Sequence, residues 1–128
     1  MEKSPLQAAT SLLEKTLAQY NVVGQCHEYK GVRRRDGYSY VTIRVPGDEG
    51  IVKKTSTTCH RAALLLKMLK EEQVTTLQIN KKLECSHLCH NKCCINVEHL
   101  TLESKRINSS RKVCARRRTC QGHDPPCL

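Results

Sequence analysis

The sequence contains no phenylalanine and no tryptophan, and aromatic residues make up only 3% of its 128 residues. Large aromatic side chains bury much of the apolar area of an ordinary core, so a core of that kind is excluded. The length fits a single domain, which we expect to span residues 1–128. Some other source of stability is therefore needed.

A long apolar run and a secretory signal are also missing. No apolar segment approaches the roughly 20 residues that a membrane helix requires, and the N-terminus is a polar, amphipathic stretch. We therefore expect no membrane partner and a reducing compartment, the nucleus or the cytoplasm, in which thiols stay reduced.

The chain has instead nine cysteines and six histidines. Structural zinc can contribute about 10 kcal/mol or more of folding free energy to a small module, so these residues can replace an aromatic core. A disulfide framework, as in small secreted proteins, is the alternative interpretation. The expected reducing compartment favours zinc.

The formal net charge is +10 and the sequence pI is about 9.3. Such a charge attracts phosphate groups and releases counterions when it is neutralised, which indicates a polyanionic partner. A membrane surface is disfavoured because no strongly basic amphipathic helix with a bulky apolar face is present. Nucleic acid, and double-stranded DNA in particular, is the expected partner.

The N-terminal part predicts a helix over residues 4–20. Ser4 can cap it, Pro5 suits its first position, and the segment Asn21–Gly24 ends it. Its apolar residues form one stripe, which predicts a helix packed on the outside of the domain: Leu6, Ala9, Leu13, Leu17 and Tyr20.

Residues 26–55 then follow a period of two, which predicts three antiparallel strands separated by turns at Asp36-Gly37 and Gly47–Gly50. In the middle strand Val41, Ile43 and Val45 point one way, so the opposite face is free to meet a ligand. A polar, arginine-bearing sheet face fits a DNA major groove, although a solvated face without specific contacts is equally consistent with these residues. The predicted DNA-binding residues here are Arg33, Arg34, Arg35, Tyr38, Tyr40 and Arg44.

A second helix is predicted over residues 57–70, with Ala62, Leu65, Leu66 and Leu69 at the spacing of one buried face. Cys59 at its start is interpreted as a buried small residue and not as a metal ligand. Residues 83–88 and 99–102 are two strands around an irregular loop, and Ser104 can cap a helix that runs to about residue 113.

On that last helix, Asn108 shares a face with Arg111 and Lys112 at i+3 and i+4. The segment Lys105–Arg118 contains seven Lys or Arg residues and no acid. A run of this kind is commonly a solvated basic face, but beside a metal-rich segment it favours contact with phosphates. The DNA-binding residues predicted here are Arg111, Lys112, Arg116 and Arg117.

Two groups of cysteine and histidine have the spacing of metal ligands. The tail Cys114-x5-Cys120-x2-His123-x3-Cys127 is a complete Cys3His set and predicts a closed structural zinc site. The set Cys89-x4-Cys94-x4-His99 lacks a fourth ligand. Three ligands and a water would make an open, catalytic zinc. Otherwise the fourth ligand comes from among Cys26, Cys59, Cys85 and Cys93.

The order Ser86-His87-Leu88-Cys89-His90-Asn91, Cys94, His99-Leu100, Glu103-Ser104, Asn108 and the tail set resembles the His-Cys box homing endonucleases. These belong to the ββα-metal, or His-Me finger, nucleases. The resemblance covers residues 85–127. It implies an α+β fold: a small zinc-stabilised domain with a three-stranded antiparallel sheet, flanking helices, a ββα-metal catalytic core over residues 83–113 and a second zinc loop over residues 114–127.

The resemblance also implies roles for single residues. His87 matches the general base, and Asn108 matches the residue that holds one catalytic Mg²⁺, for which Mn²⁺ can substitute. Neither zinc is catalytic in the family. The implied zinc ligands are Cys26, Cys89, Cys94 and His99 for the first site and Cys114, Cys120, His123 and Cys127 for the second. The family's arginine near the scissile phosphate has no unambiguous counterpart, and the candidates in order are Lys53, Lys54 and Arg61.

The implied function is a Mg²⁺-dependent DNA endonuclease of the homing or mobile-element type, which hydrolyses the phosphodiester in line and leaves 5′-phosphate and 3′-hydroxyl ends. A histidine with a pKa near 6.5 can accept the proton of the attacking water. A non-catalytic zinc module that binds DNA is the alternative; RNA is a lesser one, because only four tyrosines can stack on bases. Family members dimerise through a tail beyond the second zinc, which is absent from this sequence, so a homodimer is left open.

Overall fold

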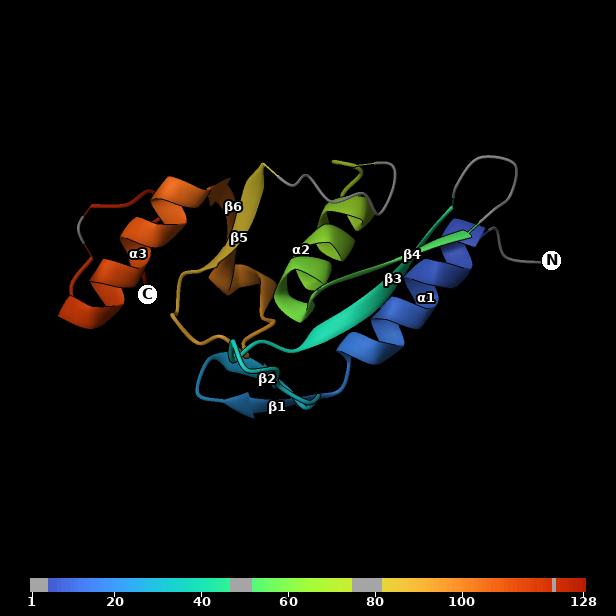
Figure 1. Ribbon diagram of the computed structural model, residues 1–128, viewed down its shortest axis with the longest axis horizontal. Helices are drawn as coiled ribbons and strands as arrows, with labels where there is room; N and C mark the ends of the chain where they lie inside the picture. Colours follow the sequence, from blue (N-terminus) through green and yellow to red (C-terminus); the bar gives the residue numbers. More distant parts are fainter. Residues whose placement is uncertain (1–4, 47–51, 75–81, 121) are drawn as a thin grey trace.

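The computed structural model describes residues 5–46, 52–74, 82–120 and 122–128 (Figure 1). Its strands form three separate antiparallel pairs, β1–β2, β3–β4 and β5–β6. In chain order the elements are α1 (Pro5–Leu17), β1 (Tyr20–Val23), β2 (Cys26–Tyr29), β3 (Tyr40–Pro46), β4 (Val52–Thr58), α2 (Cys59–Lys70), β5 (Leu83–His87), the 3-10 helix η2 (Val97–His99), β6 (Leu100–Ser104) and α3 (Lys105–Arg117).

The α+β class with antiparallel pairing is confirmed, but the single three-stranded sheet predicted over residues 26–55 is wrong. β2 pairs with β1, whose residues were expected to end the first helix, because Gly24 at φ +59° turns the chain back on itself. The other edge of β2 bonds to the cysteine-rich loop: Tyr29 N–H donates to the Cys93 carbonyl at 3.0 Å, and Ile95 N–H to the His27 carbonyl at 2.8 Å. Both edges of β2 are thus occupied, and β3 pairs with β4 alone.

The apolar core lies where α1, α2 and the β3–β4 pair meet, in the half of the molecule opposite α3 (Figure 1). Ala9, Leu13 and Leu17 from the predicted α1 stripe are buried, as are Val41 and Ile43 on the predicted inner face of β3. α2 buries residues Ala62 to Leu66, and Cys59 is a buried core residue as expected. Ser4, the expected cap of α1, and the turn at 47–50 lie outside the described residues.

The β5–β6 hairpin lies between α2 on one side and α3 on the other, and α3 forms the far end of the molecule from α1 (Figure 1). Ser104 caps α3 as predicted, since its hydroxyl accepts from the Ile107 N–H at 3.3 Å. The helix continues to Arg117, four residues past the predicted end, and Arg118 ends it in the left-handed conformation. None of the described helices has the length and apolar character to span a membrane.

Candidate active site and metal centres

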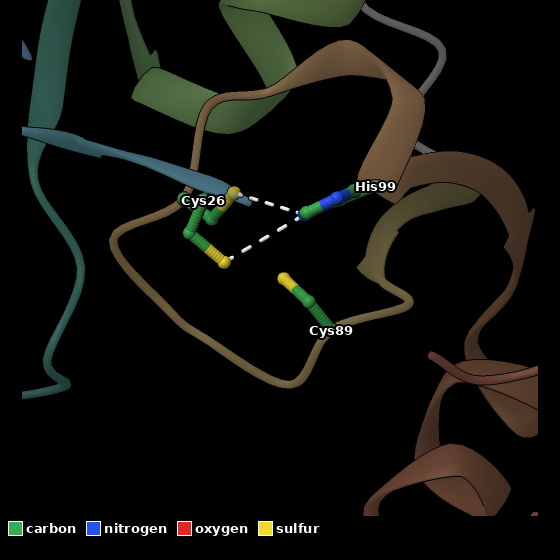
Figure 2. A group of neighbouring side chains, drawn as sticks. Cys26, Cys89 and His99 are labelled. Atoms are coloured by element: carbon green, nitrogen blue, oxygen red, sulfur yellow. Dashed lines mark hydrogen bonds between the residues drawn. The ribbon is translucent and has the colours of Figure 1, made fainter. Parts of the chain in front are cut away.

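The first ligand set joins three elements that lie far apart in the sequence. Cys26 begins β2, Cys89 and Cys94 lie in the loop after β5, and His99 ends η2. Their four ligand atoms lie within 4.8 Å of one another, and Figure 2 shows the side chains of Cys26, Cys89 and His99 pointing toward one another. His99 Nδ1 is 3.6 Å from the Sγ of Cys26 and 3.5 Å from that of Cys94. Ligands of a tetrahedral zinc ion are separated by roughly 3.3–3.8 Å, so the set fits zinc.

Cys26 completes the first set, whereas the other fourth-ligand candidates, Cys59, Cys85 and Cys93, are buried thiols outside it. All nine cysteines are free. The zinc interpretation requires free thiols, whereas the disulfide interpretation requires paired ones. Because four protein ligands leave no open position on a tetrahedral ion, this geometry favours a structural zinc over an open catalytic one.

The second ligand set comes from the end of α3 and the segment that follows it. Cys114, Cys120, His123 and Cys127 also place their ligand atoms within 4.8 Å of one another, and His123 Nδ1 lies 3.3 Å from Cys114 Sγ. Hydrogen bonds from the backbone N–H groups of Cys127 and His123 lower the pKa of Cys120 to about 5, which favours the thiolate that zinc needs. His123 Nε2 contacts the Ser110 hydroxyl at 2.9 Å, which fixes the orientation of the ring.

His87 is the last residue of β5 and is only 9% exposed. Its Nε2 lies 3.0 Å from the Cys94 carbonyl, and because a carbonyl only accepts, Nε2 carries the proton. The lone pair of the neutral ring is therefore on Nδ1. Burial lowers the pKa of His87 to about 4. The His60 ring packs against it with centroids 4.1 Å apart, so the imidazole is fixed in both orientation and tautomer.

Asn108 lies in the first turns of α3, facing the β5–β6 hairpin. Its Nδ2 donates to Glu84 Oε2 at 2.6 Å, which leaves the amide oxygen as the group that can meet a cation. His87 and Asn108 line the same cavity of about 280 Å³, together with Lys92, Lys112 and Arg116. The two residues with implied catalytic roles are thus brought to one site, although they come from different elements.

A second cavity of about 490 Å³ also includes Asn108, and Arg61 lines it. The Arg61 guanidinium donates to the Leu83 carbonyl at 2.6 Å, which holds it beside β5. Lys53 and Lys54 are both exposed on β4, and neither lines these two cavities. Of the three candidates, Arg61, the last in the predicted order, is the one that lines one of these two cavities.

Most of the predicted DNA-binding residues are exposed. Arg34 stacks on the Tyr40 ring at 4.0 Å from its centroid, so the first turn presents an ordered cationic surface. Tyr38 differs, because it packs against His60 and lines both cavities. The exposed basic residues among those predicted to bind DNA are Arg33, Arg34, Arg35, Arg44, Lys112, Arg116 and Arg117.

Arg111 corrects the prediction of an exposed phosphate contact, since only 1% of it is exposed. Its guanidinium donates to both Glu103 oxygens, at 2.5 and 2.8 Å, and to Cys127 Sγ at 3.5 Å. Burial by itself would raise the pKa of Glu103, but the hydrogen bonds from Arg111 and Ser86 lower it. Arg111 therefore ties α3 and the second ligand set to the hairpin.

Three residues of the site have no role assigned from the sequence: His60, Glu84 and Glu103, of which only Glu103 belongs to the quoted family pattern. Glu84 and Glu103 lie in strands that must be largely buried. Because buried carboxylates are almost always paired, each of them indicates that a partner lies nearby. In the antiparallel register Glu84 lies directly opposite Glu103. That register, with α3 placed over the same face, would have identified their partners, Asn108 and Arg111.

The fold and site define a small zinc-organised α+β protein built around a hairpin and a helix. The family model described as the zinc-binding loop region of homing endonuclease matches residues 22–127, and the chain belongs to this family. The resemblance inferred from the sequence is thereby confirmed. None of the curated proteins in the comparison matches the chain.

Proposed function

We propose that the protein is a Mg²⁺-dependent DNA endonuclease of the homing or mobile-element type, which leaves 5′-phosphate and 3′-hydroxyl ends. The observation that carries the proposal is the shared cavity of about 280 Å³, which His87 and Asn108 line together with basic side chains. A histidine that can take a proton, an oxygen ligand for a hard cation and positive charge for a phosphate are the components that phosphodiester hydrolysis requires.

His87 accepts the proton of the attacking water in this proposal. Its Nε2–H is held by the Cys94 carbonyl, so Nδ1 is the basic atom. The lowered pKa keeps the ring unprotonated at neutral pH, and an anionic phosphate bound in the cavity would raise it toward neutrality and strengthen the base. Packing against His60 keeps the ring from turning away from the water.

Asn108 holds the cation through its amide oxygen. The site fits Mg²⁺, which prefers oxygen ligands and is usually held by few protein groups together with substrate phosphates. When bound, Mg²⁺ would stabilise the negative charge that grows on the phosphate and the leaving oxygen. Arg61, which lines the neighbouring cavity of about 490 Å³ together with Asn108, would face the scissile phosphate.

The DNA duplex would contact the exposed basic surface of the first turn, β3 and α3. Each lysine or arginine that neutralises a phosphate adds to the salt dependence of binding. The net charge of +10 supports such binding without regard to sequence. Sequence-specific contacts would come from the side chains of the Arg33–Arg35 turn and from Arg44.

A supercoiled plasmid incubated with the zinc-loaded protein and Mg²⁺ tests the proposal. His87→Ala should reduce cleavage by at least about a hundredfold, the lower range for a general base. His27→Ala is the matched control, because His27 stacks on Tyr20 away from the cavity. Cleavage that survives His87→Ala would contradict the mechanism.

The same assay separates the remaining alternatives. Tight binding to DNA without cleavage, in either Mg²⁺ or Mn²⁺, would favour the non-catalytic DNA-binding module. A nicked product indicates one active site acting on one strand, whereas a linear product formed without a nicked intermediate indicates a homodimer that cuts both strands.

A further inference from the structure

We propose that Glu84 is a positioning residue of the cation site, which holds the Asn108 amide with its oxygen toward the cavity and supplies negative charge for the metal. The inference rests on the proposed function. Glu84 Oε2 lies 2.6 Å from Asn108 Nδ2, and both residues line the cavity of about 490 Å³.

The hydrogen bond selects one of two orientations of the amide. A side-chain amide has an oxygen at one end and an NH₂ group at the other, and rotation by half a turn exchanges them. A carboxylate can only accept, so Asn108 must present its NH₂ group to Glu84. The amide oxygen then points away from Glu84, as a metal ligand must. Without this partner, half of the amide orientations would direct hydrogens at the cation.

The negative charge of Glu84 also offsets the positive charges of the side chains around it. Arg61 and Lys112 line the same cavity and would repel a divalent cation. The other acid in this lining, Asp36, is held by the Tyr40 hydroxyl and the Tyr38 N–H. Glu84 is therefore the carboxylate placed next to Asn108 to balance the positive charge.

The position of Glu84 is difficult to explain as a contribution to stability. Glu84 lies directly opposite Glu103 in the hairpin, and like charges at such positions destabilise a strand pair. Glu103 is neutralised by the Arg111 guanidinium, whereas the hydrogen-bond partner of Glu84 among the described residues under α3 is the uncharged amide of Asn108. A residue that costs stability at a functional site is expected to contribute to function.

The experiment measures Mn²⁺ binding to the zinc-loaded protein by electron paramagnetic resonance, without DNA, and the Mg²⁺ concentration required for half-maximal plasmid cleavage. Glu84→Ala should weaken both by at least about tenfold, the usual lower range for residues that orient metal ligands. Glu84→Gln keeps the shape and one acceptor oxygen but removes the charge, so it should lie between the wild type and Glu84→Ala. Neither variant should lower the free energy of unfolding.

A matched control exists in the same chain. Asn91 Nδ2 donates to Glu28 Oε2 at 2.8 Å, a pair of the same chemistry that lies outside both cavities. Glu28→Ala should leave Mn²⁺ binding unchanged. If Glu84→Ala fails to fold, the near-isosteric Glu84→Gln still decides the question.

Asn108→Ala separates this inference from the proposed function. Loss of Mn²⁺ binding in Asn108→Ala, with wild-type binding in both Glu84 variants, overturns the role of Glu84 alone. Wild-type protein that neither binds Mn²⁺ nor cleaves DNA overturns both. A loss of stability in Glu84→Gln equal to its loss of Mn²⁺ affinity would make Glu84 a structural residue and contradict the inference.

Discussion

The two Cys3His sets of this protein differ in how far apart their ligands lie along the chain. The first set takes Cys26 from β2 and its other ligands from residues 89–99, so it closes a long loop and joins the β1–β2 hairpin to the loop and 3-10 helix between β5 and β6. The second set lies entirely within residues 114–127. A zinc ion in the first set would therefore hold distant parts of the fold together, whereas one in the second would fold a local segment.

The comparison also applies to the site itself. The Cys94 carbonyl that fixes His87 belongs to a ligand of the first set. The second set reaches the hairpin through Arg111, whose guanidinium bonds to both Cys127 and Glu103. The first set thus holds the His87 ring directly, and the second supports the position of α3, which carries Asn108.

Loss of the first set should have the largest effect. Cys26→Ala should remove one of two zinc ions and most of the tertiary structure, because a structural zinc contributes about 10 kcal/mol or more to a small module. Zinc analysis and denaturant unfolding measure this. Cys93→Ala is the control, since Cys93 is a buried thiol outside both sets. If Cys26→Ala kept two zinc ions, Cys26 would not be a required ligand of the first set, and the contrast between the two sets would fail.

Loss of the second set should be more local. Cys120→Ala should also release one zinc ion, but the β1–β2 and β5–β6 pairs should keep their amide protection because none of their residues belongs to this set. Hydrogen exchange should show faster exchange over residues 114–128, and cleavage should fall because α3 is less firmly held. Global unfolding in this variant would contradict the distinction between the two sets.

Arg111→Met tests the link between the β5–β6 hairpin and the second ligand set. Removing one partner of a buried ion pair leaves an uncompensated charge, here Glu103, and costs about 3–5 kcal/mol of unfolding free energy. The double variant Arg111→Met, Glu103→Gln should recover part of this loss. Arg116→Met, at an exposed position of the same helix, should change stability by less than about 0.5 kcal/mol.

The smallest effect concerns pH. The pKa of His87 is lowered to about 4, so the unprotonated base is lost only as the pH falls toward 4. The value of kcat/KM should therefore stay level between pH 8 and pH 6, whereas a histidine of pKa 6.5 would leave about a quarter of the activity at pH 6. Zinc content is measured at each pH as the control. An acid limb centred near pH 6.5 would show that His87 is not held as described.

The difference between ligands that are close along the chain and ligands that are far apart also explains what the sequence could predict. The second set was identified from spacing alone because its ligands are neighbours along the chain. Cys26 was one of four equivalent candidates by spacing, and only the family resemblance selected it. The incorrect sheet has two causes. The turn at Gly24 is a local signal, but it is interpreted above as the end of the first helix, and the bonding of β2 to the loop around Cys94 joins residues far apart in the sequence.

Arg111 illustrates the limit of helical periodicity. The spacing correctly placed Asn108 and Arg111 on one face of α3, but periodicity does not tell which surface that face meets. A face with an asparagine and an arginine suggested DNA, whereas it covers a strand pair that carries Glu84 and Glu103. The complementary charges were both present in the sequence, but their pairing depends on the register of β5 with β6 and on the packing of α3.

The polar contact between α3 and the β5–β6 hairpin also determines the register of the helix. The described apolar cluster includes no residue from α3, and the contact includes the Glu84–Asn108 hydrogen bond and the Glu103–Arg111 ion pair, one turn apart. An apolar interface would allow α3 to shift along the hairpin by a fraction of a turn. Here any such shift would separate both polar pairs at once. The helix therefore has one allowed position along its own axis. This position fixes the Asn108 oxygen in space, although α3 adds no apolar side chain to the described core.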